Sequence, residues 1–374
     1  GKVVKMEKNI RDKADYVIDA KGCYVMPGFI DMHVHLRDPG QEQKETIETG
    51  CNAAAHGGYT TILAMPNTKP VVDNLETLSY VQEKGEQTPI HVLQAAAITK
   101  GLQGKELVDM EALADAGAAG FTDDGIPLMD EKLLVQAMEQ AKALGLPLAF
   151  HEEDPALMSE PGVHKGKVAE QIGYGGAARA AEDVMVARDC MLALHTGASV
   201  CIQHISSKNS VELVRLAKML GADVHAEATS HHFTLTEEAV LKYGTLARMN
   251  PPLRTEEDRQ AIIKGIQDGT IDMIVTDHAP HSEEEKEEDF LEYLYMGWKS
   301  GTEIWPHQVK MHLELMDAEL KRLESGLMES GYLRKRAENS GYRLTELGKV
   351  QGEECLLRHH NLTQFLQMTC GLEE

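Results

Sequence analysis

Eight short apolar segments, seven of them followed by a segment with helical periodicity, constrain the fold of this chain more than any other feature. The apolar segments are rich in β-branched residues and end in polar clusters, as buried strands do. They cover residues 25–35, 60–67, 91–95, 118–125, 147–152, 199–204, 222–227 and 272–278. Apolar residues at three- and four-residue spacing predict helices over residues 43–56, 74–86, 105–116, 130–144, 178–196, 208–220 and 255–268.

Strand alternating with helix predicts an α/β fold with parallel strands, because each strand must be joined to the next by a crossover. Right-handed crossovers repeated around eight strands close the sheet into a (β/α)8 TIM barrel. In that fold the carboxyl ends of the strands form one rim, and active sites lie there. Polar residues at the predicted strand ends are therefore the candidates for function.

Histidine and aspartate side chains end five of these strands. His33 and His35 end the first strand two positions apart, so both imidazoles leave the same face. The other strand ends contribute Asp124, His151, His204 and Asp277. A lone His-x-His would equally suit a solvated strand face, but six donors at one rim predict a metal site. Histidine and carboxylate without cysteine favour zinc or a similar divalent metal, and six ligands suit two ions.

A pair of zinc ions at this rim would supply what the hydrolysis of an amide needs, namely a nucleophile at neutral pH and a polarised carbonyl. Zinc lowers the pKa of bound water to about 7 and polarises a carbonyl, so two ions can hold a bridging hydroxide beside the substrate. A carboxylate next to that hydroxide can take its proton and pass it to the departing nitrogen. We assign this proton shuttle to Asp277, with a role as ligand alone as the alternative.

Six short motifs occur in a fixed order along the chain. They are His-Leu-Arg-Asp-Pro-Gly at 35–40, Met-Pro-Asn-Thr at 65–68, Phe-Thr-Asp-Asp-Gly at 121–125, His-Glu-Glu-Asp at 151–154, Met-Asn-Pro-Pro-Leu-Arg at 249–254 and Thr-Asp-His-Ala-Pro-His at 276–281. With them, the chain from about residue 15 to residue 290 resembles the amidohydrolase superfamily, and within it the dihydroorotases of the shorter bacterial type. The resemblance implies interconversion of (S)-dihydroorotate and N-carbamoyl-L-aspartate in de novo pyrimidine biosynthesis at a binuclear zinc centre.

The resemblance also implies how the ligands divide. His33, His35 and Asp277 would hold one zinc, His151 and His204 the other, and Asp124 would bridge them. Many relatives bridge with a carboxylated lysine, but residues 121–125 contain none, so the chain resembles the subgroup that uses aspartate. Asp123 is the competing bridge, because adjacent strand residues face opposite ways. The family spacing to His151 favours Asp124.

Four further residues match substrate-binding positions of the family pattern, namely Arg37, Asn67, Asn250 and His281. Arg37 lies two residues beyond His35 and so shares the face of the two histidines. A guanidinium binds a carboxylate in bidentate fashion, and dihydroorotate carries one beside its ring. Turn formation is the alternative role for both asparagines, because each lies next to proline.

Composition restricts the partners and the compartment. The chain has 37 basic and 60 acidic residues, a net charge of −23, which argues against binding to nucleic acid or to an anionic membrane. Six cysteines without close pairing favour a reduced cytoplasmic setting. We expect no signal peptide, and no apolar stretch approaches the ~20 residues that span a bilayer. We expect a small-molecule substrate, with a homo-oligomer or association with another pyrimidine enzyme as the protein partners.

The two ends depart from the family. Residues 1–27 are expected to be the remnant of a small flanking β-domain, which the terminal segments would form and which is incomplete here. Residues 28–290 would form the metal-binding barrel. Residues 291–374 match no family segment and are predicted to be largely helical, with residues 306–327 covering the eighth strand. A fragment would explain the beginning of the chain, and a disrupted reading frame, a replaced segment or true divergence would explain the tail. The family's glycine-rich loop after His281 is missing, so we expect an intact metal rim with weakened substrate binding.

Two alternative functions follow from the same residues. A hydantoinase or allantoinase would use the same metals, but the absence of a bridging lysine and the presence of Arg37 and Asn67 weigh against it. A catalytically weak dihydroorotase-like scaffold would typically lack metal ligands, whereas all six are present here.

Overall fold

The computed structural model describes most of the chain. The described residues are 3–8, 10, 12–243, 247–281, 294–295, 298–299, 304–306, 308–309, 317–334 and 341–353. Eight strands of the first 281 residues occur where the apolar segments predict them. They are β1 Phe29–Val34, β2 Tyr59–Ala64, β3 His91–Gln94, β4 Phe121–Thr122, β5 Leu148–Phe150, β6 Val200–Ile202, β7 Val224–Thr229 and β8 Met273–Val275.

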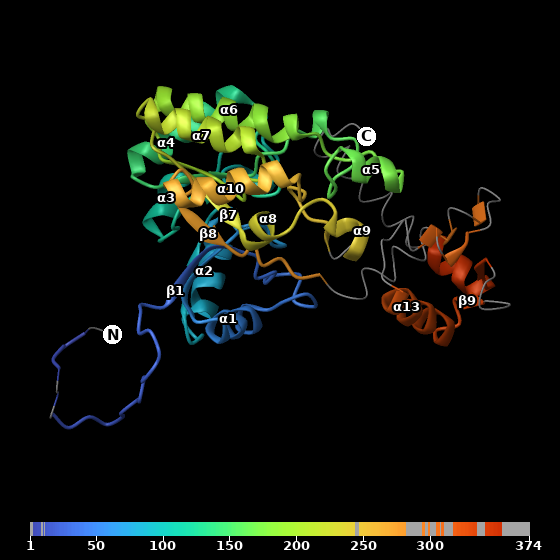
Figure 1. Cartoon of the computed structure of the whole chain (residues 1–374), viewed down its shortest axis with the longest axis horizontal. Helices are drawn as coiled ribbons and strands as arrows, with labels where there is room; N and C mark the ends of the chain where they lie inside the picture. The colour runs from blue at the N-terminus through green and yellow to red at the C-terminus, as the bar shows by residue number, and fades with distance from the viewer. Residues whose placement is uncertain are drawn as a thin grey trace.

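The eight strands are parallel and close into a barrel (Figure 1). Continuous ladders join β1 to β3 and β4 to β8. A parallel bridge between Ala96 and Phe121 links the two groups on one side. On the other side Val34 bridges His278, and the His35 amide donates to the His278 carbonyl at 2.8 Å. The predicted (β/α)8 architecture is confirmed.

Helices connect successive strands and cover the outside of the barrel (Figure 1). The seven predicted helices are present as α1 Ile47–His56, α2 Leu75–Gly85, α3 Met110–Asp115, α4 Glu131–Leu144, α6 Arg179–Thr196, α7 Lys208–Met219 and α10 Glu256–Asp268. Shorter elements interrupt the loops at the rim: α5 Lys167–Ile172, α8 Ser230–Thr234, α9 Ala239–Tyr243, η1 Lys100–Leu102 and η2 Pro155–Leu157. Local signals set the ends of the main helices. The Asn74 side chain caps α2, and Gly145 ends α4 in a left-handed conformation.

One hydrophobic cluster packs the helices onto the strands. Phe121, Leu148 and Ile202 on neighbouring strands are fully buried, and Leu134 and Val214 on the covering helices contact the same cluster. Burial of such side chains contributes about 1.5–3 kcal/mol each. This core holds the strand ends in fixed positions, which is what a rim of ligands requires.

The segment before β1 extends away from the barrel (Figure 1). Within the described residues 3–27 there is no strand, and Val4, Tyr16, Ile18 and Tyr24 are exposed. These residues by themselves therefore form no β-domain. The flanking β-domain expected from the terminal segments stays a prediction.

The chain beyond the barrel has a core of its own. It contains α13 Asp317–Glu329 and the antiparallel strands β9 Leu333–Arg334 and β10 Arg343–Leu344. The buried apolar side chains of α13 pack with this hairpin in a cluster separate from the barrel core. Ile274 on β8 remains half exposed. The predicted cover of the eighth strand by the tail thus finds no support in α13 and stays a prediction.

Two smaller observations concern the cysteines and the helices. Cys23, Cys51, Cys190 and Cys201 are free thiols. Among the described residues, every helix is too short or too polar to cross a bilayer.

Candidate metal centre

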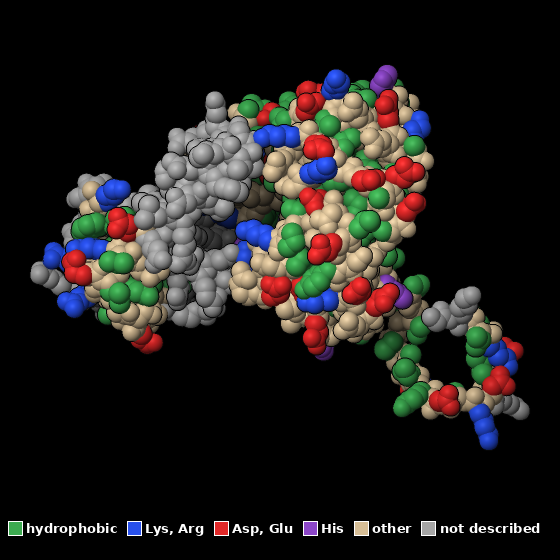
Figure 2. Space-filling view, turned by 180° about the vertical axis from the view of Figure 1, so that it is seen from behind, with side chains coloured by type: hydrophobic (Ala, Val, Ile, Leu, Met, Phe, Trp, Pro, Cys, Tyr) green, Lys and Arg blue, Asp and Glu red, His purple; other side chains and the backbone are tan. Residues whose placement is uncertain are grey.

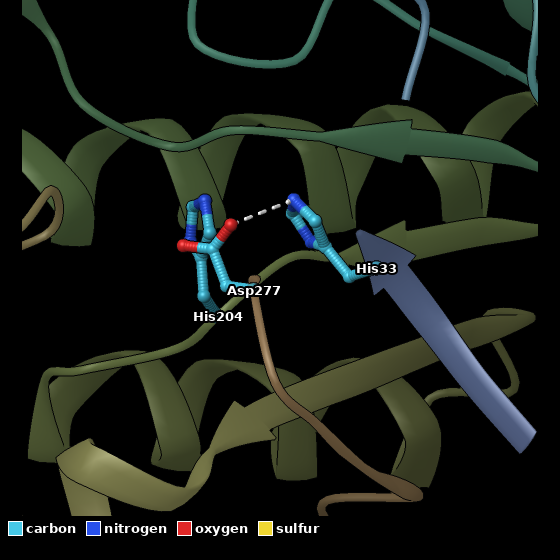
Figure 3. Close-up of side chains that lie close together, drawn as sticks. All are labelled: His33, His204 and Asp277. Atoms are coloured by element: carbon cyan, nitrogen blue, oxygen red, sulfur yellow. Dashed lines mark ion pairs between the residues drawn. The ribbon is translucent and has the colours of Figure 1, made fainter. Parts of the chain in front are cut away.

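All six predicted ligands converge at the carboxyl ends of the barrel strands. Three overlapping groups place their donor atoms within 4.8 Å of one another: His33 with His204 and Asp277, His33 with His35 and Asp124, and Asp124 with His151 and His204. Figure 3 shows the first group, in which Asp277 and His204 face His33 across the rim. Residues from five different strand ends therefore share one cluster, as the barrel prediction requires.

The distances show which atoms face the centre of the cluster. Nε2 of His33 lies 3.5 Å from Asp124 Oδ1 and 3.4 Å from Asp277 Oδ1. Nε2 of His35 lies 3.3 Å from Asp124 Oδ2 and 3.1 Å from Asp277 Oδ1. His204 Nε2 lies 2.9 Å from His151 Nδ1 and 3.9 Å from Asp124 Oδ1. Asp124 Oδ1 thus faces both His33 and His204, and its Oδ2 faces His35, so the carboxylate lies between the two groups of histidines.

Backbone conformation at the rim is unusual. Arg37, His204 and Asp277 adopt positive φ angles of 61°, 31° and 50°. Residues with a Cβ atom rarely adopt such angles, and each costs of the order of 1–3 kcal/mol. Three predicted site residues share this feature. The fold therefore tolerates a less favourable backbone conformation at the positions that direct side chains toward the cluster.

Polar partners behind the cluster orient three of the histidines. Glu227 Oε2 lies 3.0 Å from His33 Nδ1, Asn67 Oδ1 lies 2.8 Å from His35 Nδ1, and Glu153 Oε2 lies 3.0 Å from His151 Nε2. A partner on one ring nitrogen fixes the tautomer, so the other nitrogen presents a lone pair to the cluster. This arrangement is typical of metal-binding histidines.

Charge in the cluster suits cation binding. Burial alone would raise the pKa of Asp124, but His33 and the neighbouring histidines lower it below its usual range. Asp277 behaves similarly, because burial raises its pKa but His35 and the other histidines outweigh that effect. Both carboxyl groups are therefore ionised, and a carboxylate must be ionised to bind a metal.

Three buried atoms test whether a metal fits. His33 Nε2, Asp124 Oδ1 and His204 Nδ1 are buried without a hydrogen bond among the described residues. An unpaired buried polar atom costs about 1–3 kcal/mol. Two of them, Nε2 of His33 and Oδ1 of Asp124, point at each other across 3.5 Å, which is long for a hydrogen bond. A cation at this rim would satisfy both, so the cluster is compatible with a metal-binding site.

Asp123 faces away from the cluster. Its Oδ1 accepts from the Ile98 amide at 2.7 Å and the Thr99 amide at 3.0 Å, and its Oδ2 pairs with the Thr99 hydroxyl. Burial raises the pKa of Asp123 to about 6 in spite of these donors. Its hydrogen bonds hold the loop after β3, which leaves Asp124 as the carboxylate at the centre.

The four predicted substrate residues differ in position. Arg37 follows β1, and its Nε donates to the Pro280 carbonyl at 3.3 Å, so it adjoins the loop that carries His281. Asn250 and His281 are exposed. Asn67 instead lies within the cluster, because its Nδ2 is 3.4 Å from Asp124 Oδ2 while its Oδ1 faces His35. Its binding of substrate stays a prediction, and orientation of His35 is an added role.

Buried polar groups also anchor the loops that support the rim. Glu182 accepts from the amides of Ser206 and Ser207, just after His204, at 3.0 and 2.9 Å. Arg254 donates to Ser206 Oγ at 2.7 Å and lies 3.2 Å from Glu182. The segment with Asn250 is held by His232, whose Nε2 lies 2.9 Å from the Pro251 carbonyl. Burial lowers the pKa of His232 to about 3, so this histidine is a neutral structural residue.

The sequence analysis missed Glu227 and Glu153 as functional residues. Glu227 lies on β7 and Glu153 lies two residues beyond His151, so both sit at strand ends. The same rule that found the ligands applies to them. Their role as hydrogen-bond partners of histidine was not evident from the sequence, because it depends on which ring nitrogen of His33 or His151 each carboxylate contacts in the folded chain.

Sequence comparison identifies relatives over most of the chain. A model of the family described as dihydro-orotase-like matches residues 22–210. A dihydroorotase of Clostridioides difficile (strain 630) is 62% identical over 280 residues, which cover 75% of this chain and 66% of the relative. A dihydroorotase of Clostridium acetobutylicum is 55% identical over 78% of this chain and 69% of the relative. A dihydroorotase of Pelotomaculum thermopropionicum is 42% identical over 344 residues, which cover 88% of this chain and 81% of the relative.

Solved structures with a similar fold include two hydantoinases. The L-hydantoinase (dihydropyrimidinase) from Arthrobacter aurescens has a TM-score of 0.63 and 25% identity over 72% of this chain and 62% of its own. A D-hydantoinase has a TM-score of 0.63 and 23% identity over 75% of this chain and 64% of its own. The chain thus spans just under two thirds of the length of these structures and of the first sequence relative. By its sequence match, its barrel and its rim of ligands, the chain belongs to the dihydro-orotase-like family.

Proposed function

We propose that the chain is a metal-dependent dihydroorotase that interconverts dihydroorotate and N-carbamoyl-aspartate. The observation that carries this proposal is the convergence of four histidines and two aspartates at one barrel rim. The relatives named dihydroorotase, at 42–62% identity, support the substrate class. The hydantoinase likeness is weaker, at 25% identity or less in those two structures, and supports the fold more than the substrate.

We assign His33, His35 and Asp277 to one divalent ion, His151 and His204 to a second, and Asp124 to both. Zinc is the metal we expect, since the donors are imidazole and carboxylate. When bound, two such ions supply an activated water and polarise the carbonyl of a cyclic amide.

Asp277 is the residue we assign to proton transfer. Its side chain is 15% exposed, against 4% for Asp124, so of the two carboxylates it is the one that a substrate can reach. It is ionised, as its lowered pKa indicates, and can therefore accept a proton. The proton would then pass to the ring nitrogen that leaves when the amide opens.

Arg37 is the residue we assign to the substrate carboxylate. It is partly buried and lies three residues beyond the end of β1, which carries His33, and two residues beyond His35. The chain as a whole is strongly acidic, so an anionic substrate needs local positive charge to bind. Arg37 supplies that charge, with Asn250 and His281 expected to add polar contacts.

The test combines metal content with substrate choice. The purified chain should contain about two equivalents of zinc by elemental analysis and turn over dihydroorotate in preference to hydantoin and allantoin. Asp124→Asn should lose metal and activity together, whereas Asp115→Asn, at an exposed position of α3, should keep both. A metal-free chain would support the scaffold alternative. Preference for hydantoin would support the hydantoinase alternative.

A further inference from the structure

The C-terminal unit, which we define as the described residues from 294 to 353, is a small fold distinct from the barrel core. Residues 294–295, 298–299, 306 and 308–309 are helical and precede α13, and the β9–β10 hairpin follows. Leu294, Val309, Leu323 and Tyr342 come from these successive elements and share one buried cluster. The dihydroorotase function proposed above uses none of them.

Contacts between distant elements hold this unit together. The Tyr342 amide donates to the Ile304 carbonyl at 2.8 Å, so Ile304 lies beside the residue that precedes β10. Lys349 Nζ lies 4.7 Å from the centre of the Trp298 ring, a cation–π contact between helical residues 346–353 and 298–299. Among the described residues, the order is therefore helical residues at 294–295 and 298–299, helical residues at 306 and 308–309, α13 and the hairpin.

Two arginines of the hairpin form an unusual pair. Arg334 on β9 and Arg343 on β10 are direct cross-strand partners. Like charges in this position destabilise a hairpin. Both are exposed, and neither side chain makes a hydrogen bond or ion pair with another described residue. They line a hollow of about 870 Å³ between the hairpin and the end of α13, together with Glu346, whose carboxylate pairs with Lys349 at 2.6 Å. A repulsive pair at an open hollow favours a ligand with negative charge.

The charge of this region differs from that of the chain as a whole. The sequence from residue 294 to residue 353 has nine basic and nine acidic side chains, whereas the whole chain has a net charge of −23. Within it, residues 321–349 have seven basic and four acidic side chains. On α13, Leu320, Leu323 and Leu327 face the buried cluster, while Lys321 and Ser325 are exposed. Figure 2 shows Lys and Arg side chains along the outer edge of this unit. The acidic excess therefore belongs mainly to the remainder of the chain.

We propose that the C-terminal unit binds duplex DNA. In a helix-turn-helix the second helix enters the major groove. In this unit α13 would take that place, because it follows the helical residues 306 and 308–309. Lys321 and Ser325 on its exposed face would meet the groove. Arg334 and Arg343 would contact phosphates beside it, and the phosphates would relieve their mutual repulsion. The earlier expectation against nucleic acid rested on net charge, which describes the chain and not this surface.

The test measures binding of the full chain to a labelled random-sequence duplex of about 20 base pairs by fluorescence anisotropy. Affinity should be of the order of 10⁻⁶ M at low salt and fall as salt rises. Arg334→Glu/Arg343→Glu should weaken binding at least tenfold, and Arg334→Gln/Arg343→Gln should lower the salt slope by about 2. Lys132→Glu/Lys264→Glu, an equal charge change at exposed barrel positions, should alter affinity less than twofold.

Three outcomes would overturn the proposal. They are no salt-dependent binding by the unaltered chain, unchanged binding by both arginine double variants, and equally tight binding of poly-L-glutamate, which would indicate an acidic protein partner instead. Turnover of dihydroorotate should be the same in all these variants, so a failure of DNA binding is separable from a failure of the enzyme. Circular dichroism of each variant checks that the hairpin remains folded.

Discussion

Glu227 Oε2 lies 3.0 Å from His33 Nδ1, although the two residues are 194 positions apart in the chain. Both side chains are buried. The carboxylate holds the ring so that Nε2 faces Asp124 and Asp277, and it favours the tautomer in which Nε2 carries the lone pair. His33 can serve as a metal ligand in this orientation only.

Removal of the Glu227 carboxylate should therefore weaken metal binding. We expect Glu227→Ala to lower the affinity for zinc about 10–100-fold, as loss of such a partner typically does. Competition with a chromogenic chelator measures this. Glu227→Gln keeps a hydrogen-bond acceptor and should lose less, and Glu139→Gln at an exposed position of α4 is the control. Unchanged affinity in Glu227→Ala would show that the contact does not position His33.

Asp277→Asn tests the proton shuttle. The substitution removes both the charge of a ligand and the proton acceptor, so kcat should fall about 10²–10⁴-fold. Asp277→Glu keeps the charge and should retain part of the activity. Zinc content is measured in parallel, because a variant with full metal and no turnover would separate the two roles. Near-normal kcat in Asp277→Asn would contradict both of them.

Arg37→Met tests recognition of the substrate carboxylate. A hydrogen bond to a charged group contributes about 1.5–3 kcal/mol, so KM for dihydroorotate should rise roughly 10–150-fold. KM for dihydrouracil, which lacks the carboxylate, should change little. Arg37→Lys keeps the charge without the bidentate geometry, so its KM for dihydroorotate should lie between that of the unaltered chain and that of Arg37→Met. Equal effects on the two substrates would favour a hydantoinase-like site.

Substitution of Arg254 tests whether the buried Arg254–Glu182 pair stabilises the loops at the rim. The Arg254–Glu182 pair is buried, with side chains 1% and 2% exposed, so Arg254→Met leaves an unpaired carboxylate in the interior. We expect a loss of about 3–5 kcal/mol in the free energy of unfolding, measured by urea denaturation. Arg215→Met breaks the more exposed pair with Asp268 and should cost less than about 1 kcal/mol. Similar losses in both variants would contradict this account, and Arg254→Met/Glu182→Gln should recover part of the stability.

Much of the barrel and its rim was predictable from the sequence. Apolar periodicity is local, so it marked the eight strands and seven covering helices correctly. Because parallel strands of a barrel end at one rim, the sequence also predicted that His33, Asp124 and His204 lie close together. Beyond the barrel the sequence imposed fewer constraints, and the expectation that the tail covers β8 stays a prediction.

The sequence by itself determined the barrel and the chemistry at its rim, because strand period and strand order decide which side chains share an edge. Only the tertiary structure decided the contacts behind that edge. Asp124 and not Asp123 faces the centre because the Ile98 and Thr99 amides bind Asp123. Asn67 turns to His35, 32 residues away, because β1 and β2 lie side by side. Such choices depend on distances of a few tenths of an ångström between segments far apart in the chain, and periodicity carries no information about them.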